Sequence, residues 1–584
     1  MKNKNVINSL ILAVSISLLT GCGSRSGGSG SYSGYNEYDN YSTTYYDSSK
    51  ADVKNLAQPN KVFSAYNGKN NIEIKNIPID SSKEVLYACL ITNPSSEPIK
   101  DITFIPPLAG NVRTSEEIPS QSVREENNIS PTLPVIPFRE NLADKARLKE
   151  ELYNKYLENE ANNKRVPIRA NTGHQAEVEG QKNINITVLS KTRNCTLAKV
   201  STYGKFFIDQ DGDGSVFAPD ISDSSLNQLA EEFDNYIYPT LKENFGNGSD
   251  IFWRDVDNDG KLSIVFSPVI NNYKKSVVGI FDTASINSSN PRDMISVAVK
   301  SNKSSESYEK WFMDARETIA HEMQHIVNFS AKSGRSETLW IDEGLSVCAE
   351  ILYRKKRSEA GLNSYCLYYD SEYPDFPGND ARFYYAAYYM PELSVTSFSS
   401  DDDSIALAHY GQKGLFFYYL YEQYGKEIFK QLCQAPERGT EKFEVLDRSL
   451  GELAIDFNFA VLNEKIRDIA LTNYAVNPYD IADRKYKFIT NMSLKFDRSQ
   501  NGSFFLVDKY YIEQRFNDLL KEKKYNILAD SRGYVNPIPA NGGTVRLFLK
   551  QHQGFNSRLS GSNSYSLSFS SSSPIVINMM RVSQ

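Results

Sequence analysis

Histidine and cysteine are scarce in this sequence, with five and six residues among 584. So few cysteines exclude a fold that depends on a dense disulfide framework, although their number allows one disulfide. The chain also lacks a basic patch with interleaved aromatic residues, and its net charge is −7, so nucleic acid is not expected as a partner. With 40% hydrophobic and 23% charged residues it fits the globular class, and its length predicts two to four domains.

The apolar stretch near the N-terminus, residues 10–19, is too short for a mature membrane-spanning helix. It follows two lysines and predicts an export signal. Residues 19–22 resemble a bacterial lipobox, so residues 1–21 are predicted to be a lipoprotein signal peptide that is cleaved before Cys22. Lipidation of Cys22 would anchor the chain to a membrane, in the bacterial cell envelope, at a periplasmic or surface-exposed position. An ordinary secretory signal with a chance cysteine is the alternative.

Composition and periodicity predict how the two ends of the chain are organised. Residues 22–56 are mainly Gly, Ser, Asn and Tyr, which predicts a flexible tether. Short alternating runs within 62–108 predict strands, and the charged segment 143–163 predicts a linking helix. Together these patterns predict an N-terminal β-rich domain over 57–180, and returning strand patterns predict a C-terminal β domain over 489–584.

The middle of the chain alternates between helix and strand patterns. Apolar spacing predicts an amphipathic helix over 226–241 and a long helix over 405–424. Short apolar runs between them predict strands at 262–266, 277–281 and 294–299.

Residues 321–325 have the pattern H-E-x-x-H. On a helix, His321 and His325 share one face, so both imidazoles can point at one metal ion. Glu322 lies beside the first histidine and can act as the base toward a zinc-activated water. The motif fixes only three positions, so a chance match is the alternative. An apolar stripe nevertheless predicts that it lies on an amphipathic helix from about residue 307 to 329.

Glu343 is the predicted third zinc ligand, because a catalytic zinc takes three protein ligands and keeps one position for water. It lies in the segment 339–352, which predicts a second helix with Asp342 available as its cap. Glu350 follows Glu343 by two turns and shares nearly the same face. Either Glu350 or Asp342 is therefore expected to orient a zinc histidine from behind. A solvated helix start, where acids are common, is the alternative for Glu343.

The pattern H-E-x-x-H at residues 321–325, followed by W-x-D-E-G at residues 340–344, resembles the gluzincins. Within them it is most similar to the hyicolysin family of secreted bacterial neutral metallopeptidases. The resemblance covers roughly residues 205–434, and its other matching segments are 233–239, 245–246, 255–260 and 410–411.

The resemblance implies a zinc-dependent endopeptidase domain over residues 181–488, acting on protein or peptide substrates. It also implies an α+β fold of the zincin, gluzincin-like type, with a mixed sheet, an active-site helix and a helical C-terminal subdomain, flanked by the two β domains. In gluzincins an edge strand of the sheet binds the substrate backbone, and residues 295–299 are the nearest candidate by order.

The sequence departs from the family pattern at two points. Thermolysin-like gluzincins hold a zinc histidine with an aspartate four residues after the glutamate ligand, and that position is Val347 here. The Gly-x-Met-Glu-Asn motif of aminopeptidase gluzincins is absent, which favours cleavage inside a chain. The family also adds a Tyr or His that stabilises the oxyanion. Tyr410 is the first candidate for this role and His409 the second.

Two acidic loops have the D-x-D-x-D-G spacing of calcium sites. The first has carboxylates at positions one, three, five and twelve, namely Asp209, Asp211, Asp213 and Asp220. The second has a phenylalanine at position twelve and carboxylates at Asp255, Asp257 and Asp259. Acids that only shape a turn are the alternative for both loops.

Two other classes of function stay open at this point. One is a catalytically inert surface adhesin or binding lipoprotein built on a peptidase fold. The other is a zinc hydrolase that acts on cell-wall peptides. The sequence leaves the oligomeric state undetermined.

Overall fold

The chain is a mixture of helices and sheets, as the α+β prediction requires. The computed structural model describes residues 62–67, 71–78, parts of 85–105, 177–299 with short gaps, 308–332, 337–362, parts of 381–398, 403–471 apart from 447 and 449, residues 485 and 488, and 525–526, 544–551 and 564–581 apart from 572. The predicted signal peptide with Cys22, the tether and the linking helix at 143–163 lie outside the described residues. Among the described helices, none combines the length and the hydropathy that a membrane span needs.

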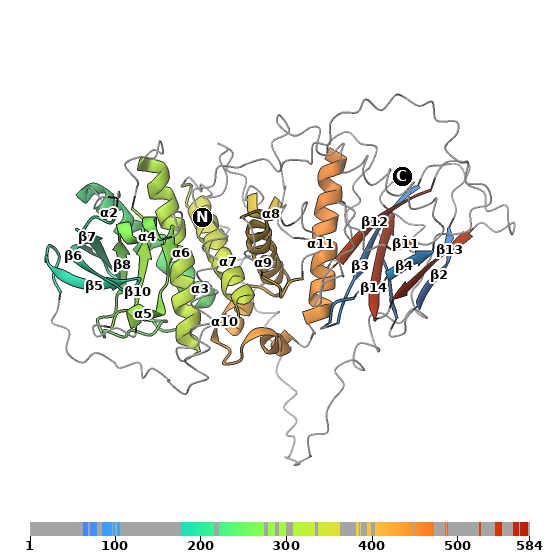
Figure 1. The fold of residues 1–584 in the computed structure, drawn as a ribbon, viewed down its shortest axis with the longest axis horizontal. Coiled ribbons are helices and arrows are strands. Elements are labelled where there is room, and N and C mark those ends of the chain that lie inside the picture. The colour runs from blue at the N-terminus through green and yellow to red at the C-terminus, as the bar shows by residue number, and fades with distance from the viewer. Residues whose placement is uncertain are drawn as a thin grey trace, which may run out of the picture. The chain divides into compact units, whose positions relative to one another are not determined.

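A six-stranded mixed sheet forms one layer of the middle region (Figure 1). Its strands, in spatial order, are β5 (Ile184–Val188), β6 (Lys191–Val200), β7 (Gly204–Asp209), β8 (Leu262–Phe266), β10 (Met294–Val297) and β9 (Gly279–Ile280). β7, β8 and β10 are parallel neighbours and are buried along their whole length. Such strands are apolar on both faces because both faces are covered, which explains their continuous hydrophobic runs.

The edge of this sheet differs from the expectation. The prediction that residues 295–299 form the edge strand is wrong, because β10 pairs with β8 on one side and β9 on the other. The chain forms β9 first, passes through the short helix α5 (Thr283–Ile286) and then inserts β10 between β8 and β9. In the sheet as described, β9 is the edge strand next to β10, and it runs antiparallel to it.

The helical segments follow the predicted periodicities. The helix expected over 226–241 is continuous but composite, since its α-helical ends flank a π-helical turn. Its three parts are α2 (Asp223–Glu232), η4 (Phe233–Ile237) and α3 (Tyr238–Phe245). Shorter or more peripheral helices of the described residues include α4 (Pro268–Asn272), α8 (Ala381–Tyr384), α10 (Glu427–Gln434), the 3-10 helix η6 (Gly439–Leu446) and α11 (Leu450–Leu471).

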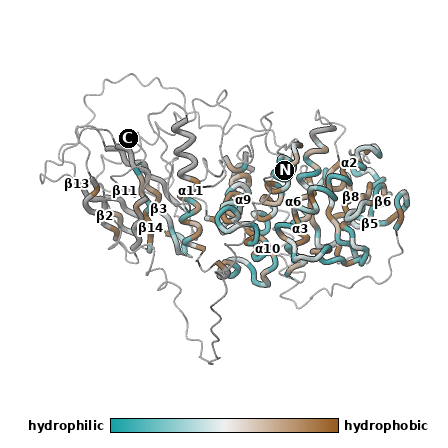
Figure 2. Tube along the Cα trace, turned by 180° about the vertical axis from the view of Figure 1, so that it is seen from behind, coloured by the Kyte–Doolittle hydropathy of each residue, from teal (hydrophilic) through white to brown (hydrophobic). Residues whose placement is uncertain are grey.

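Three long helices lie side by side next to the sheet: α6 (Tyr308–Ala331), α7 (Leu339–Glu359) and α9 (Asp403–Tyr424) (Figure 1). α6 packs on β9 and β10, and α7 lies between α6 and α9. All three helices were predicted from the sequence, and α9 ends before Gly425 as expected. The apolar stripe of α6 is buried in the main core, with Trp311, Ala315, Ile319, Met323, Ile326 and Val327. Figure 2 shows hydrophobic segments along β8 and the helices beside it.

Glycines allow α9 to approach its neighbours closely. A Cβ on Gly344 of α7 would collide with the ring of Phe417, and one on Gly414 of α9 would collide with Val347. A Cβ on Gly411 would overlap the backbone carbonyl of Arg382 in α8. Val347, which stands where the family has an aspartate, is therefore a packing residue between α7 and α9.

Gly411→Ala is expected to lower the free energy of unfolding by about 1–3 kcal/mol, because the added methyl group must displace backbone. This loss should exceed the roughly 1 kcal/mol that alanine contributes over glycine inside a helix. Gly212→Ala is the matched control, since its Cβ would lie at an ordinary 3.4 Å from the carbonyl of Val216. Denaturant unfolding followed by tryptophan fluorescence measures both variants. Equal stability of Gly411→Ala and the parent would contradict the close packing.

The terminal strands join in common sheets. The first contains β1 (Val62–Asn67), β14 (Ile575–Arg581), β3 (Val85–Thr92) and β12 (Thr544–Gln551), and the second contains β11 (Tyr525–Asn526), β4 (Ile102–Ile105), β13 (Ser564–Ser571) and β2 (Asn71–Pro78). Separate β domains over 57–180 and 489–584 are therefore not what the structure contains. Strand β1, for example, needs β14 for its hydrogen bonds, and both sheets combine strands from the two ends.

The cysteines form no disulfide in the part of the chain that is described. Cys89, Cys195, Cys348 and Cys433 are buried free thiols. Burial raises the pKa of Cys348 well above its usual value, as expected for a small apolar packing residue in α7.

Candidate metal centre

Two histidines and a glutamate converge between α6 and α7. His321 and His325 are one helical turn apart on α6, with ring centroids 4.9 Å apart and both side chains buried. The Oε2 atom of Glu343, from the first turns of α7, lies 3.2 Å from Nε2 of His321 and 3.8 Å from Nε2 of His325. The structure thus brings the three predicted zinc ligands together at their Nε2 and Oε2 atoms.

The other ring nitrogen of each histidine faces a different carboxylate. Nδ1 of His321 lies 2.5 Å from Oε1 of Glu350, and Nδ1 of His325 lies 2.9 Å from Oδ2 of Asp342. A carboxylate only accepts hydrogen bonds, so with the proton on Nδ1 each ring would donate to the carboxylate behind it and leave the lone pair of Nε2 for a metal. The sequence offered Glu350 or Asp342 for this role, and in the structure each of them contacts one histidine.

Arg382 of α8 holds Glu350 in place. Its Nη2 lies 2.5 Å from Oε2 of Glu350, and both side chains are buried. Burial by itself raises the pKa of Glu350, but Arg382 and His321 outweigh it and hold that pKa below its usual value. Glu350 is therefore a carboxylate at neutral pH. Sequence analysis did not find Arg382, because it follows His321 by 61 positions and has no motif of its own.

The side chain of Asp342 is more exposed to solvent than that of Glu350. Its Oδ1 accepts a hydrogen bond from Nδ2 of Asn328 at 2.7 Å, and its side chain is 24% exposed. The expectation that Asp342 caps α7 is wrong, since Thr338 is the N-cap residue. The carboxylate turns toward His325 because Asp342 lies one turn inside the helix, on the face that meets α6.

Glu350→Gln and Asp342→Asn are expected to separate stability from metal affinity. Both should weaken zinc binding by about 10–100-fold, as loss of a carboxylate behind a ligand histidine generally does. Only Glu350→Gln should also destabilise the fold, by about 3–5 kcal/mol, because it removes the buried negative charge that faces the buried guanidinium of Arg382. Zinc competition with a chelator and thermal unfolding measure the two effects. Similar melting of the two variants would contradict the distinction.

Glu322 lies next to the three ligands and is buried. Its Oε2 is 3.9 Å from Nε2 of His325 and accepts a hydrogen bond from the backbone N–H of Phe281 at 2.9 Å. Phe281 directly follows β9, whose Gly279 has no room for a side chain against Thr318 of α6. The edge strand is thus held close to the helix that carries Glu322.

Tyr410 and His409 both lie on α9 and are buried. The ring of Tyr410 packs edge-on against Phe398 at 5.2 Å, and the ring of His409 stacks on Phe398 at 5.4 Å. Burial and the nearby Lys413 lower the pKa of His409 well below its usual value, so this histidine is neutral. A role for Tyr410 or His409 toward an oxyanion stays a prediction.

The first acidic loop is held by cations. Nε of Arg193 donates to Oδ2 of Asp209 at 2.7 Å, and Nζ of Lys191 donates to Asp213 at 2.9 Å. Asp211 accepts a hydrogen bond from a backbone N–H instead. These contacts satisfy the carboxylates that the sequence assigned to calcium.

Asp220, the fourth acid of that loop, lies outside the described residues. Among the residues that the structure does describe, two groups have ligand atoms close enough together to hold a metal ion, and neither belongs to the first loop. They are the pair His321 and His325 with Glu322, beside which Glu343 also lies, and the group Asp255, Asp257 and Asp293. The structure therefore gives no support to calcium in the first loop.

The residues of the centre fit zinc in their chemistry. Two imidazole nitrogens and one carboxylate are a known donor set of catalytic zinc sites, and a carboxylate behind each ring favours the tautomer that a metal requires. Glu322, a further acid, lies beside the set, with its Oε2 atom 3.9 Å from Nε2 of His325. Such an arrangement is typical of metal-dependent hydrolases.

Comparison with known proteins agrees with this class at a coarse level. The chain is 27% identical over 274 residues to the neutral metalloprotease ShpI of Staphylococcus hyicus, covering 41% of this chain and 54% of that protein. The chain thus spans about half the length of this curated relative. No protein-family model matches the chain. That relative is a metalloprotease, in keeping with a metal centre in this chain.

Proposed function

We propose that this chain is a zinc-dependent endopeptidase that cleaves proteins outside the cytoplasm while attached to the bacterial cell envelope by a lipid. The observation that carries the proposal is the convergence of His321, His325 and Glu343 with a second acid, Glu322, next to them. The N-terminal sequence pattern supports the lipid anchor. The missing aminopeptidase motif supports cleavage inside a chain.

The residues of the centre divide the work of hydrolysis. His321, His325 and Glu343 would hold zinc, which when bound polarises the scissile carbonyl and acidifies a water molecule. Glu322 accepts the proton of the attacking water on a carboxylate oxygen and delivers it to the leaving amine. The N–H of Phe281 keeps that carboxylate facing the site. Tyr410 is proposed to stabilise the oxyanion.

Strand β9 is the proposed docking edge for substrate. It lies at the border of the described sheet, and its neighbour Phe281 contacts Glu322 directly. An extended peptide that pairs with β9 would place its backbone beside the metal centre and would be recognised with little dependence on its side chains.

Hydrolysis of casein and of internally quenched peptides, with and without 1,10-phenanthroline, tests the proposal. We expect cleavage at internal bonds, loss of cleavage with the chelator, and recovery when zinc is restored. If the zinc-loaded protein leaves casein and the quenched peptides uncleaved, an inert binding protein is favoured. Cleavage of muropeptides alone would favour a hydrolase of cell-wall peptides.

A further inference from the structure

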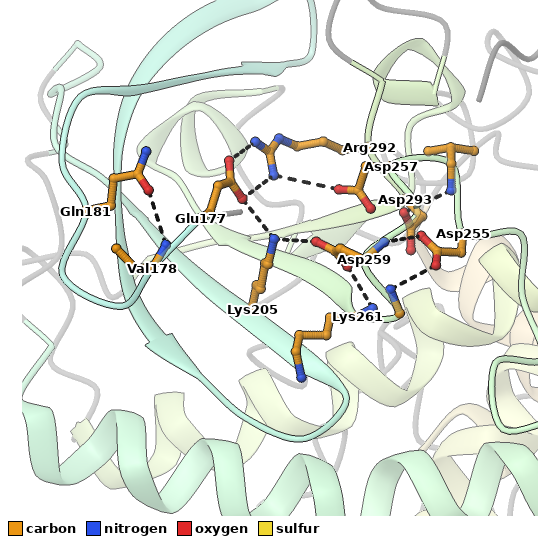
Figure 3. A network of polar contacts seen from close by, with 12 residues as sticks. Glu177, Val178, Gln181, Lys205, Asp255, Asp257, Asp259, Lys261, Arg292 and Asp293 are labelled. Atoms are coloured by element: carbon orange, nitrogen blue, oxygen red, sulfur yellow. Dashed lines mark hydrogen bonds and ion pairs between the residues drawn. The ribbon is translucent and has the colours of Figure 1, made fainter. Parts of the chain in front are cut away.

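A second group of carboxylates shares no residue with the metal centre. Asp255 and Asp257 belong to the loop before β8, and Asp293 directly precedes β10 (Figure 3). One carboxylate oxygen from each lies within 4.8 Å of those of the other two. Because β8 and β10 are parallel neighbours, this group joins the loop to the amino ends of both strands.

Two of the three aspartates are oriented by hydrogen bonds. The carboxylate of Asp255 accepts from the backbone N–H groups of Asp259 and Gly260 at 3.1 and 2.8 Å. Oδ2 of Asp293 accepts from the indole Nε1 of Trp253 at 2.5 Å. Each carboxylate oxygen has more than one lone pair, so these bonds position the groups and still allow them to bind a cation.

Asp257 differs from the other two aspartates in its lack of hydrogen bonds. Its side chain is 1% exposed, and neither carboxylate oxygen has a hydrogen-bond partner. The cation that approaches it, Nη1 of Arg292, is 3.9 Å from Oδ2, and that guanidinium is already hydrogen-bonded to Glu177 (Figure 3). A buried carboxylate without hydrogen bonds is strongly destabilising unless another positive charge reaches it.

The local balance of charge is negative. Figure 3 draws five carboxylates, from Glu177, Asp255, Asp257, Asp259 and Asp293, and three cations. Lys205 and Arg292 pair with these carboxylates, whereas Nζ of Lys261 donates to the backbone carbonyls of Ser201 and Thr202. Burial and the carboxylate of Asp259 raise the pKa of Asp257 to about 7, and burial and Asp257 raise the pKa of Asp293 well above its usual value. The carboxylates thus repel one another without a further cation.

We infer that Asp255, Asp257 and Asp293 form a calcium site that joins the loop before β8 to the start of β10. Carboxylate oxygens suit a hard divalent cation, and calcium accepts the irregular oxygen geometry that a loop and a strand end provide. Asp259, the third acid of the D-x-D-x-D-G pattern, is paired with Lys205 and so is not assigned as a ligand.

The position of the site predicts what calcium does. It ties together the amino ends of β8 and β10, and β10 carries the edge strand β9, which reaches Glu322 through Phe281. Binding should therefore stabilise the sheet that supports the metal centre. The effect is separate from zinc ligation and can be measured without any peptidase activity.

Calcium binding to the full chain tests the inference. The protein carries Glu322→Gln to prevent self-cleavage, is stripped of metals with EDTA and is reloaded with one equivalent of zinc. Titration with CaCl₂ in a calorimeter should show one calcium per chain, and excess CaCl₂ should raise the Tm by on the order of 5 °C. Absence of both effects would overturn the site.

Asp257→Asn assigns the effect to this site. It should abolish the rise in Tm with CaCl₂. In calcium-free buffer it should melt no lower than its parent, because it removes a repelling charge. Asp213→Asn, in the first acidic loop, is the matched control and should keep the full calcium response. A response lost in Asp213→Asn, or kept in Asp257→Asn, would place calcium elsewhere. If Asp257→Asn does not fold, the partly exposed Asp255→Asn provides the same comparison.

Terbium gives an independent location for the ion. Tb³⁺ accepts the same oxygen ligands as Ca²⁺, and its emission is sensitised by a nearby indole. Since Trp253 is hydrogen-bonded to Asp293, bound Tb³⁺ should show strong emission on tryptophan excitation, and CaCl₂ should displace it. Trp253→Phe should remove most of that emission while calcium still raises the Tm. Unchanged emission from Trp253→Phe would contradict the assignment.

Discussion

Glu322→Gln is expected to lower peptide hydrolysis by about 10²–10⁴-fold or more while zinc stays bound. The three proposed metal ligands are separate residues, so the substitution leaves that donor set intact. Glutamine has nearly the same shape, and its amide oxygen can still accept from the N–H of Phe281. What it cannot do is accept the proton of the attacking water.

Rates with a quenched peptide, together with zinc content by elemental analysis, measure this prediction. Glu231→Gln on the exposed face of α2 is the control and should match the parent in both. If Glu322→Gln hydrolyses the peptide at the parental rate, Glu322 is not the base. If it loses zinc as well as activity, it contributes to metal binding and the two roles need to be reassigned.

His321→Ala and Glu343→Gln are expected to lose zinc and activity together. Loss of a residue behind a ligand weakens zinc by about 10–100-fold, and loss of a ligand itself should exceed that range. Each variant removes one of the three atoms that converge, so the remaining two cannot complete the site. Zinc content after dialysis against a weak chelator measures the effect.

Glu359→Gln, at the exposed end of the same helix as Glu343, is the matched control and should keep its zinc. Glu343→Gln should fold, since glutamine has nearly the same shape as glutamate and its side-chain amide can still contact both histidines. Full zinc content in Glu343→Gln would show that a different residue is the third ligand.

Helix and strand positions in the middle of the chain followed from local patterns. The predictions covered the helices at 308–331, 339–359 and 403–424 and the strand at 262–266. The spacing of apolar residues in each segment indicates which residues are buried and whether the segment is a helix or a strand. The β regions at the two ends were assigned to separate domains, although their strands pair with each other. Strand pairing between residues 62–67 and 575–581 leaves no local trace in the sequence.

At the candidate site, the spacing of His321 and His325 was sufficient to predict one shared helix face. It was not sufficient to say which carboxylate lies behind which ring, or that Arg382 stands behind Glu350. Similarly, the D-x-D-x-D-G pattern suggested three acids of one loop, whereas the cluster in the structure contains Asp293, directly before β10, in place of Asp259.

The sequence by itself determined the helix that carries H-E-x-x-H, the second helix with Glu343, and the chemistry these residues can perform. The reason is that helical periodicity and residue type are local properties. Only the tertiary structure decided the edge strand, the partners of the histidines and the aspartate cluster at Asp257. Each of these depends on which distant segments pack together, and packing is chosen by the whole core rather than by any one stretch of chain.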